Sequence, residues 1–204
     1  MVAIIDYDAG NIRSVEKAVE YLGFEPIVTR DESVILSASH VILPGDGAFG
    51  DAMEHLTEYG LIDVIEKVVE KKIPFLGICL GLQLLFDSSE ESPGVKGLSL
   101  IPGKVIKIPS SDAYKIPQIG WNTLSYPNRG RLFEAIPENT YAYFVHSYYV
   151  HADDPGVVTA TTEYGVTVHA SVESGNIFGC QYHPEKSSDM GLKMLANFLR
   201  ISEA

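Results

Sequence analysis

The first half of this chain alternates short apolar runs with stretches of helical periodicity, and this alternation limits the possible folds more than any other feature. The apolar runs occupy residues 2–5, 26–29, 40–43 and 73–78. Strands separated by helices usually lie parallel in one sheet, and the helices cover its two faces. We therefore predict an α/β fold with a mostly parallel central sheet flanked by helices.

Helical spacing marks the segments between these runs. After Asn11, a suitable N-cap, apolar residues recur at every third or fourth position as far as Gly23, where the helix should stop. Residues 51–72 form the longest helical stretch, with a break expected at Gly60. Beyond Gly94 the pattern becomes β-rich, over 105–108, 141–150, 157–162, 167–172 and 177–182, and a last helix is expected over 190–201. We predict a β-rich antiparallel extension in the C-terminal half and a single domain over residues 1–204.

Composition narrows the functional classes. The 204 residues are 46% hydrophobic, enough for one sizeable core, and the net charge of −12 without a basic run argues against nucleic-acid binding. The apolar runs fall far short of the roughly 20 residues that span a bilayer, and the N-terminus lacks a basic leader, so we expect no membrane segment and a cytoplasmic location. Two cysteines are too few for a disulfide framework, and a reducing compartment suits a working thiol.

Gly77-Ile78-Cys79-Leu80-Gly81 follows the fourth apolar run and leads into a helical pattern. This order predicts a nucleophile on a sharp strand-to-helix turn, where flanking small residues are needed because a Cβ would collide with the neighbouring backbone. The partial positive charge at the start of the helix favours thiolate over thiol. A lone cysteine in an α/β core is more often a small buried hydrophobe, but the glycines on both sides favour a nucleophile.

A cysteine nucleophile needs a base, and the base needs an orienting acceptor on its other nitrogen. His183-Pro184-Glu185 offers both. Proline disfavours helical geometry at the preceding residue, and positions two apart in an extended segment share a face. Alone, this tripeptide is more simply a turn at a strand end. Together with Cys79 it predicts a triad of Cys79, His183 and Glu185.

The other histidines and Cys180 are weaker candidates. His146 and His151 lie an odd number of positions apart on one expected strand and so should face opposite ways. We find no ligand partner at suitable spacing for His40, His55 or His169, and we expect no metal and no cofactor. Cys180, inside the expected strand 177–182, should be a packed and inert residue.

Acyl transfer also requires donors for an oxyanion. Pro44-Gly45-Asp46-Gly47 follows the third expected strand, and the carboxyl ends of neighbouring parallel strands open into one crevice. The backbone N–H groups of this tetrapeptide are candidate oxyanion donors, although an ordinary strand-to-helix loop explains the tetrapeptide equally well.

A rival site is Asp6-Tyr7-Asp8, whose paired carboxylates suit Mg²⁺-dependent phosphotransfer. It is disfavoured because the chain has no phosphate-cradling glycine loop with Lys-Ser or Lys-Thr.

Cys79 in Gly-Ile-Cys-Leu-Gly-Leu-Gln, with His183 and Glu185 in His-Pro-Glu, resembles the class I glutamine amidotransferase family over nearly the whole chain. Segments 44–49, 93–98, 117–122 and 143–148 resemble one branch of that family, the glutaminase subunits of imidazole glycerol phosphate synthases. Gly-Trp-Asn and Phe-Val-His-Ser-Tyr, within the last two segments, separate this branch from subunits that serve carbamoyl phosphate, anthranilate or guanylate synthesis.

The resemblance implies a flavodoxin-like sheet, hydrolysis of glutamine through a thioester on Cys79, and delivery of ammonia to a cyclase subunit in a heterodimer for histidine biosynthesis. It makes His183 the general base and acid, and Glu185 its orienting partner. The other residues it implies are Gly45, Asp46, Gly47 and Leu80 for the oxyanion, Gln83, His146, Ser147 and Tyr148 for glutamine, and Trp121, Asn122 and Lys186 for the cyclase interface. Asp46 departs from the family pattern, in which this position is often apolar.

Three other interpretations stay open. An amidotransferase subunit could serve a different acceptor. A thiol hydrolase or peptidase of related fold would also use Cys79 and a histidine, but it needs neither Gln83 nor a partner surface around Trp121. A noncatalytic binding module of the same fold is disfavoured because the three triad residues are all present.

Overall fold

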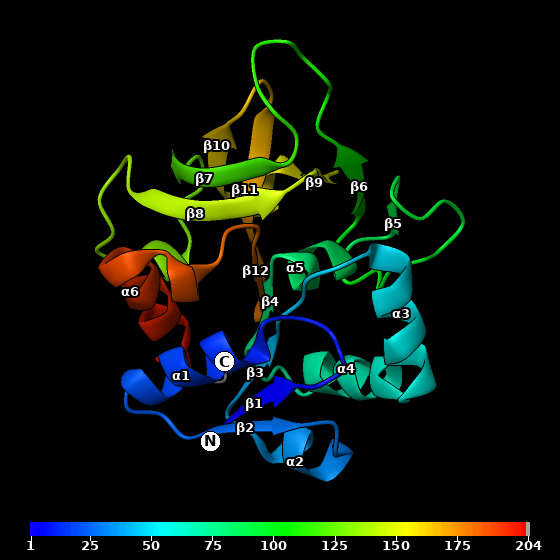
Figure 1. Cartoon of the computed structure of the whole chain (residues 1–204). Coiled ribbons are helices and arrows are strands. Elements are labelled where there is room, and N and C mark those ends of the chain that lie inside the picture. Colours follow the sequence, from blue (N-terminus) through cyan, green and yellow to red (C-terminus); the bar gives the residue numbers. More distant parts are fainter. Residues whose placement is uncertain (203–204) are drawn as a thin grey trace.

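The computed structural model describes residues 1–202, and these form one large mixed sheet with helices on both faces and a separate two-stranded sheet (Figure 1). The order of strands in the large sheet is β2 (Pro26–Thr29), β1 (Val2–Ile5), β3 (His40–Leu43), β4 (Phe75–Ile78), β12 (Ile177–Cys180), β11 (Thr167–Ser174), β9 (Tyr148–Ala152), β6 (Gly103–Lys107) and β5 (Ser88–Ser89). A tenth strand, β10 (Val158–Glu163), pairs with β11. The small sheet pairs β7 (Gln118–Thr123) with β8 (Tyr141–His146).

Five strands of the large sheet, from β2 to β12, run parallel to one another. Four of them are the apolar runs of the first half, as predicted, although β4 begins at Phe75 rather than at residue 73. The fifth, β12, comes from the far end of the chain and lies beside β4 in the register Gly179 with Gly77 and Cys180 with Ile78. Helices on both faces bury β1, β3, β4 and β12 completely, which explains their apolar sequences, whereas the edge strand β2 is half-buried.

The predicted antiparallel extension is confirmed on the other side of β12. There β11 pairs antiparallel with β12, with β10 and with β9, and β6 pairs antiparallel with β9. The prediction of a single strand over 141–150 was wrong. This segment forms two strands, β8 and β9, which are separated at Ser147 and belong to different sheets. The chain changes sheets at this point, so the odd spacing of His146 and His151 does not determine their faces.

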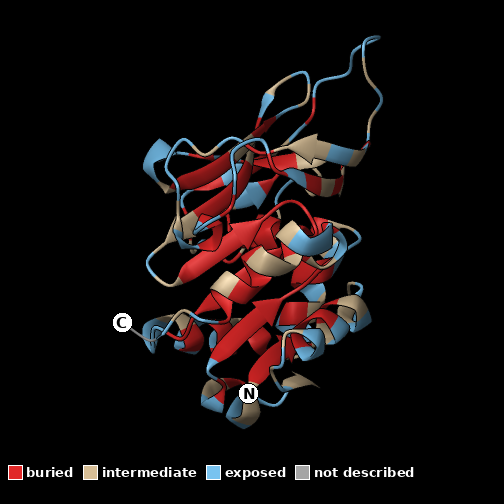
Figure 2. Ribbon diagram, turned by 90° about the vertical axis from the view of Figure 1, so that its left-hand side faces the viewer, coloured by how far each residue is buried: buried red, intermediate tan, exposed pale blue. Residues whose placement is uncertain are grey.

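Alternate residues of the parallel strands enter two separate cores. Ala3 and Ile5 of β1 pack with α2 (Glu32–Ser37), α3 (Phe49–Glu58), α4 (Leu61–Glu70) and α5 (Leu80–Leu84). Val2 and Ile4 pack with α1 (Ile12–Tyr21), α6 (Ser188–Phe198) and the inner side of the small sheet. Figure 2 shows the central strands buried and the helices exposed along their outer sides. This is the packing that period-2 strands and amphipathic helices dictate.

The ends of several helices agree with the turn residues in the sequence. The long helical stretch is divided at Gly60, whose φ of 65° lies in the left-handed region, and α1 stops just before Gly23, whose φ is 83°. Helix α2 was not predicted; Asp31 caps it by accepting a hydrogen bond from the Val34 N–H at 3.1 Å. The remaining short helices are the 3₁₀ turns η1 (Arg131–Phe133), η2 (Pro155–Val157) and η3 (Pro184–Lys186). Within residues 1–202, no helix combines the length and apolar character that crossing a bilayer requires.

The glycines around Cys79 are required by close backbone approach. A Cβ on Gly81 would lie 1.9 Å from the Leu43 carbonyl oxygen, and one on Gly77 would lie 2.5 Å from the Gly81 carbonyl oxygen. Side chains cannot yield at these positions because the colliding atoms belong to the backbone. The two glycines therefore allow β3, β4 and α5 to meet beside Cys79, which confirms the steric reason inferred from the sequence.

We expect Gly81→Ala to lower the free energy of unfolding by about 3 kcal/mol, because the new methyl group forces β3 and α5 apart. Chemical denaturation measures this change. Gly23→Ala is the control, because a Cβ there meets open space and only the positive φ opposes it, at a cost of about 1 kcal/mol. Equal effects of the two substitutions would contradict the steric explanation.

Candidate active site

Cys79 lies at the junction of β4 and α5 in a strained backbone conformation. Its φ of 56° and ψ of −107° are outside the regions that a non-glycine residue prefers. Its N–H donates to the Cys180 carbonyl at 2.8 Å, which extends the pairing of β4 with β12 by one residue. The conformation agrees with the sharp turn predicted for a nucleophile. Helix α5 has only five residues, so local N–H groups rather than a long helix dipole contribute the positive potential.

His183 and Glu185 follow β12, at the same edge of the sheet as Cys79. His183 is extended, with φ −97° and ψ 99°, as proline at the next position requires. The Nδ1 atom of His183 lies 2.8 Å from the Glu185 Oε1 atom, and the two side chains are 7% and 1% exposed. The contact that the sequence predicted is present, but the 3₁₀ turn η3, rather than a shared strand face, returns Glu185 to the histidine.

The protonation of His183 follows from its two neighbours. Burial lowers the pKa of His183, but hydrogen bonds and charge interactions with Cys79 and Glu185 outweigh burial and raise the pKa to about 10. Because a carboxylate only accepts hydrogen bonds, Nδ1 carries a proton toward Glu185 and Nε2 remains for the sulfur. The geometry therefore suits a thiolate paired with an imidazolium ion.

A pocket of about 270 Å³ opens in front of the cysteine. It is lined by most residues expected in a site, namely Cys79, His183, Asp46, Gly47, Leu80, Gln83, His146, Ser147 and Tyr148. Gly45 and Glu185 are not lining residues but contact two of them, Leu80 and His183. Trp121, Asn122 and Lys186 are not part of the lining. The pocket lies at the carboxyl ends of β3, β4 and β12, where open parallel sheets bind their ligands.

The expected oxyanion turn is closed in this conformation. The Leu80 N–H donates to the Gly45 carbonyl at 3.4 Å, so one expected donor is satisfied by the turn itself. A Cβ on Gly45 would lie 2.3 Å from the Tyr7 hydroxyl, which in turn donates to the Pro44 carbonyl at 2.8 Å. The Asp46 Oδ1 atom accepts the Gly10 N–H at 3.0 Å, which ties the turn to the loop after β1.

A chain of buried polar groups runs along the pocket wall. His146 lies with Nδ1 2.9 Å from the Tyr148 carbonyl and Nε2 3.0 Å from the Gln118 Oε1 position. Burial lowers the pKa of His146 to about 4, so the ring is neutral near pH 7. Since Nδ1–H donates to Tyr148, Nε2 is an acceptor, and it requires the Gln118 amide in the orientation that presents nitrogen.

Sequence reasoning missed two residues of the site. Gln181 is fully buried, and its Nε2 atom lies 3.7 Å from the Cys79 Sγ atom. Glu91 lines the pocket while its Oε2 atom accepts the Phe49 N–H at the start of α3. The position of Gln181 two residues before His183 was a usable signal, because both follow the strand beside the cysteine. Nothing in the local sequence connects Glu91 with the site.

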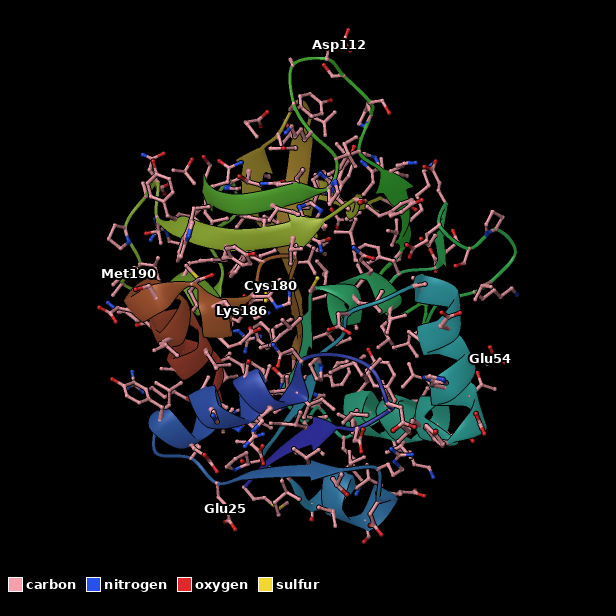
Figure 3. All side chains as sticks on the ribbon, viewed as in Figure 1. Glu25, Glu54, Asp112, Cys180, Lys186 and Met190 are labelled. Atoms are coloured by element: carbon pink, nitrogen blue, oxygen red, sulfur yellow. The ribbon has the colours of Figure 1, made fainter. Side chains whose placement is uncertain are left out.

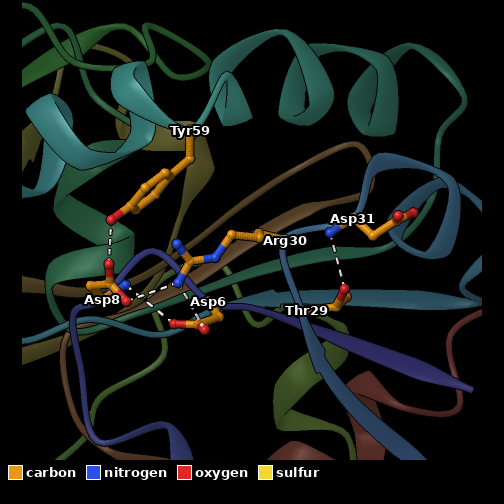
Figure 4. A network of polar contacts seen from close by, with 6 residues as sticks. All are labelled: Asp6, Asp8, Thr29, Arg30, Asp31 and Tyr59. Atoms are coloured by element: carbon orange, nitrogen blue, oxygen red, sulfur yellow. Dashed lines mark hydrogen bonds and ion pairs between the residues drawn. The ribbon is translucent and has the colours of Figure 1, made fainter.

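The rival carboxylate pair is occupied by an arginine. The Arg30 guanidinium contacts Asp6 at 3.0 Å and Asp8 at 2.8 Å, Tyr59 donates to Asp8, and Arg30 lies over the Tyr59 ring (Figure 4). Among residues 1–202, no group of three or more His, Cys, Asp or Glu side chains is placed to hold a metal. The two carboxylates form ion pairs with Arg30 and are therefore structural rather than a phosphotransfer centre.

Cys180 and the outlying histidines have surroundings unlike those of Cys79. Cys180 is buried in the interior (Figure 3), and burial raises its pKa well above the usual value. His151 and His169 stack on each other with ring centroids 5.3 Å apart, a contact that the sequence pattern did not suggest.

The outer face of the small sheet exposes aromatic and apolar side chains. Ile119 and Trp121 on β7 are 63% and 52% exposed, and the Trp121 ring lies 6.0 Å from that of Tyr143 on β8. Trp121 lies within the strand β7. The Asn122 side chain donates to the Glu163 carbonyl instead of joining this face. Lys186 is the exposed residue of the η3 turn, near the start of α6 (Figure 3).

Comparison with known sequences gives full-length matches. The family model "Glutamine amidotransferase class-I" matches residues 3–201. "Imidazole glycerol phosphate synthase subunit HisH" of Moorella thermoacetica is 52% identical over 197 residues, covering 97% of this chain and 93% of that protein. The protein of the same name from Methanocaldococcus jannaschii is 47% identical over 201 residues, covering 98% of this chain and 100% of that protein.

Solved structures give the same architecture. "Crystal structure of glutamine amidotransferase" matches with a TM-score of 0.75 and 21% identity over 97% of this chain and 99% of that chain. "Structure of PurLQS from Thermotoga maritima" matches with a TM-score of 0.73 and 23% identity, over 97% of this chain and 96% of that chain. At these identities the similarity establishes the fold, and it agrees with the α/β prediction.

The neutral His146 makes stability depend on pH. Its pKa of about 4 in the folded protein lies below the unfolded value of 6.5, so the unfolded chain gains a proton first as pH falls. Stability therefore decreases as pH falls from 6.5 toward 4, with a contribution of up to about 1.4 kcal/mol per pH unit. In His146→Gln, we expect the loss between about pH 6.5 and about pH 5 to be about 2 kcal/mol smaller in urea unfolding. His151→Gln, at an exposed position, is the control, and an unchanged slope in His146→Gln would contradict the assignment.

Proposed function

The chain belongs to the class I glutamine amidotransferase family, and we propose that it is the glutaminase subunit of an imidazole glycerol phosphate synthase. The observation that carries the proposal is the placement of Cys79 and His183 at one pocket, at the carboxyl ends of neighbouring strands, with the Glu185 carboxylate 2.8 Å from the His183 Nδ1 atom. The full-length relatives named above, 47–52% identical, support the assignment within the family. The motifs around Trp121 and His146 favour the same branch.

The reaction divides into two acyl transfers on Cys79. The thiolate attacks the side-chain amide carbon of glutamine, and the resulting tetrahedral intermediate breaks down when His183 gives its proton to the leaving ammonia. His183 then takes a proton from water, which attacks the thioester and releases glutamate and the thiolate. Glu185 keeps Nδ1 protonated and fixes the plane of the imidazole ring in both steps.

We propose that the oxyanion turn opens before attack. Rotation of the peptide between Gly45 and Asp46 removes the Gly45 carbonyl from the Leu80 N–H and turns the Asp46 N–H toward the pocket. Both N–H groups then face the developing oxyanion. The left-handed φ of Gly47, 91°, and the open space around it support a movable turn, whereas the bond from the Gly10 N–H to Asp46 restrains it.

Glutamine binding is assigned to Gln83 and to the segment from His146 to Tyr148. The Gln83 Nε2 atom donates to the Tyr148 carbonyl and to Gln181. Its oxygen is then the atom available to accept an N–H of the substrate amide. The Glu91 carboxylate at the pocket wall suits the α-ammonium group of the substrate.

We propose a cyclase subunit as the partner, bound at the outer face of the small sheet around Trp121 with Lys186 at its edge. Exposed aromatic groups of this kind are typical anchors of protein interfaces. Ammonia is a nucleophile only when unprotonated, so a path shielded from water is chemically required. The continuous large sheet supports a single domain over 1–204, and the need for a free thiol supports a cytoplasmic location.

Cys79→Ala should abolish glutamine hydrolysis while synthesis from added ammonium salts continues in the complex with the cyclase, because only the thioester step is lost. Activity with each nitrogen source measures the two outcomes. Cys180→Ala is the matched control and should change neither activity. Alkylation by a glutamine analogue at Cys180 instead of Cys79 would overturn the assignment, and turnover of peptides but not glutamine would favour the thiol hydrolase.

Trp121→Ala should raise the Kd for the cyclase about 30-fold, because truncating a central aromatic anchor costs about 2 kcal/mol. Titration calorimetry with the purified cyclase measures this effect. Tyr21→Ala is the control, since Tyr21 is 77% exposed on α1, away from the small sheet. If both variants bind the cyclase like the unmodified chain, the interface lies elsewhere.

A further inference from the structure

Gln181 makes a direct polar contact with the sulfur of Cys79. Its side chain is fully buried between β12 and the η3 turn. Its Nε2 atom lies 3.7 Å from Sγ, closer than the Val145 carbonyl oxygen at 4.0 Å. A glutamine amide inside a core requires hydrogen-bond partners on both its oxygen and its nitrogen. The sulfur is therefore one of the partners that keep this residue in the core.

The orientation of the Gln181 amide is determined by its neighbours. The Tyr148 carbonyl only accepts, so Gln83 must present its Nε2 atom there, at 3.0 Å. The second N–H of the same nitrogen points to the Gln181 Oε1 atom at 3.1 Å. With its oxygen engaged, Gln181 turns its N–H groups toward Cys79. The Tyr148 carbonyl thus sets the orientation of the Gln181 amide through the side chain of Gln83.

We propose that Gln181 is a catalytic residue that donates a hydrogen bond to the Cys79 thiolate, both before attack and when the thiolate leaves the thioester. The inference rests on the proposed function, in which Cys79 is the nucleophile. Two groups then favour the charged sulfur, the imidazolium of His183 and the neutral donor Gln181. Unlike His183, the neutral donor keeps its protons throughout the cycle, so it offers the same hydrogen bond to the free thiolate and to the thiolate that leaves the thioester.

The contribution of Gln181 differs from that of the charged surroundings. Titratable groups surround Cys79. Tyr7, Cys180 and His183 interact with its charge, and Asp46, Glu91 and His146 line the same pocket. Gln181 does not titrate, so replacing it changes a donor without changing a charge. The interaction of the sulfur with Gln181 can therefore be measured separately.

Alkylation of Cys79 by iodoacetamide as a function of pH tests the proposal on the full chain without glutamine or a cyclase. Cys180→Ala is the background, so that only one cysteine reports. In Gln181→Met, which keeps the volume but donates nothing, we expect the pH midpoint of alkylation to rise by about one unit and the rate at pH values below both midpoints to fall about tenfold. In Gln181→Glu, a near-isosteric acceptor with a negative charge, the rise should be larger.

Two controls separate this effect from loss of packing. Every variant must reach the same alkylation rate at high pH, where the thiol is ionised in all of them. Thr159→Val, an isosteric change at a buried hydroxyl outside the site, should keep the midpoint of the background. If Gln181→Met does not fold, Gln181→Leu decides the question, because it also removes the donor without adding a charge.

The outcomes distinguish a failure of the role of Gln181 from a failure of the proposed function. An unchanged midpoint in a folded Gln181 variant overturns the role of Gln181 and leaves the proposed function intact. If Cys79 in the background chain reacts no more readily than an ordinary thiol, or if Cys180 is the thiol that reacts in the unmodified chain, the proposed function itself fails.

Discussion

The pairing of β4 with β12 is the contact on which the site depends. These two strands are separated by about half of the sequence, yet they lie side by side and parallel, in the register of Cys180 with Ile78. The Cys79 N–H donates to the Cys180 carbonyl and continues that ladder into the turn. A shift of one residue would reverse the faces of the strand and remove His183 from the sulfur. The register of one strand pair therefore sets the geometry of the triad.

The local parts of this arrangement were predictable from the sequence. Glycine spacing around Cys79, proline after His183 and the alternation of apolar runs each have a local physical cause. The sharp turn at Cys79, the extended backbone of His183 and the parallel strands agree with the structure, whereas the turn that returns Glu185 to His183 was not expected. The break of the long helix at Gly60 belongs to the same class. Family resemblance added the roles of residues, which local patterns alone do not give.

Other parts depend on contacts between distant segments. The division of 141–150 at Ser147 has no glycine or proline to mark it, and it becomes visible only when β8 pairs with β7 and β9 pairs with β6. The contact of Gln181 with Cys79 joins residues far apart in the chain. Asp6 and Asp8 looked like a metal site because the arginine that neutralises them follows a different strand. Side-chain partners across a fold are not encoded in any window of sequence.

The two sides of the β7–β8 ribbon have different surroundings. Trp121 and Tyr143 face outward, whereas Gln118 and His146 of the same two strands belong to the buried polar chain beside the cysteine. The two surfaces are separated by a single layer of backbone. The same two hydrogen-bonded strands therefore border both the exposed outer surface and the pocket beside Cys79.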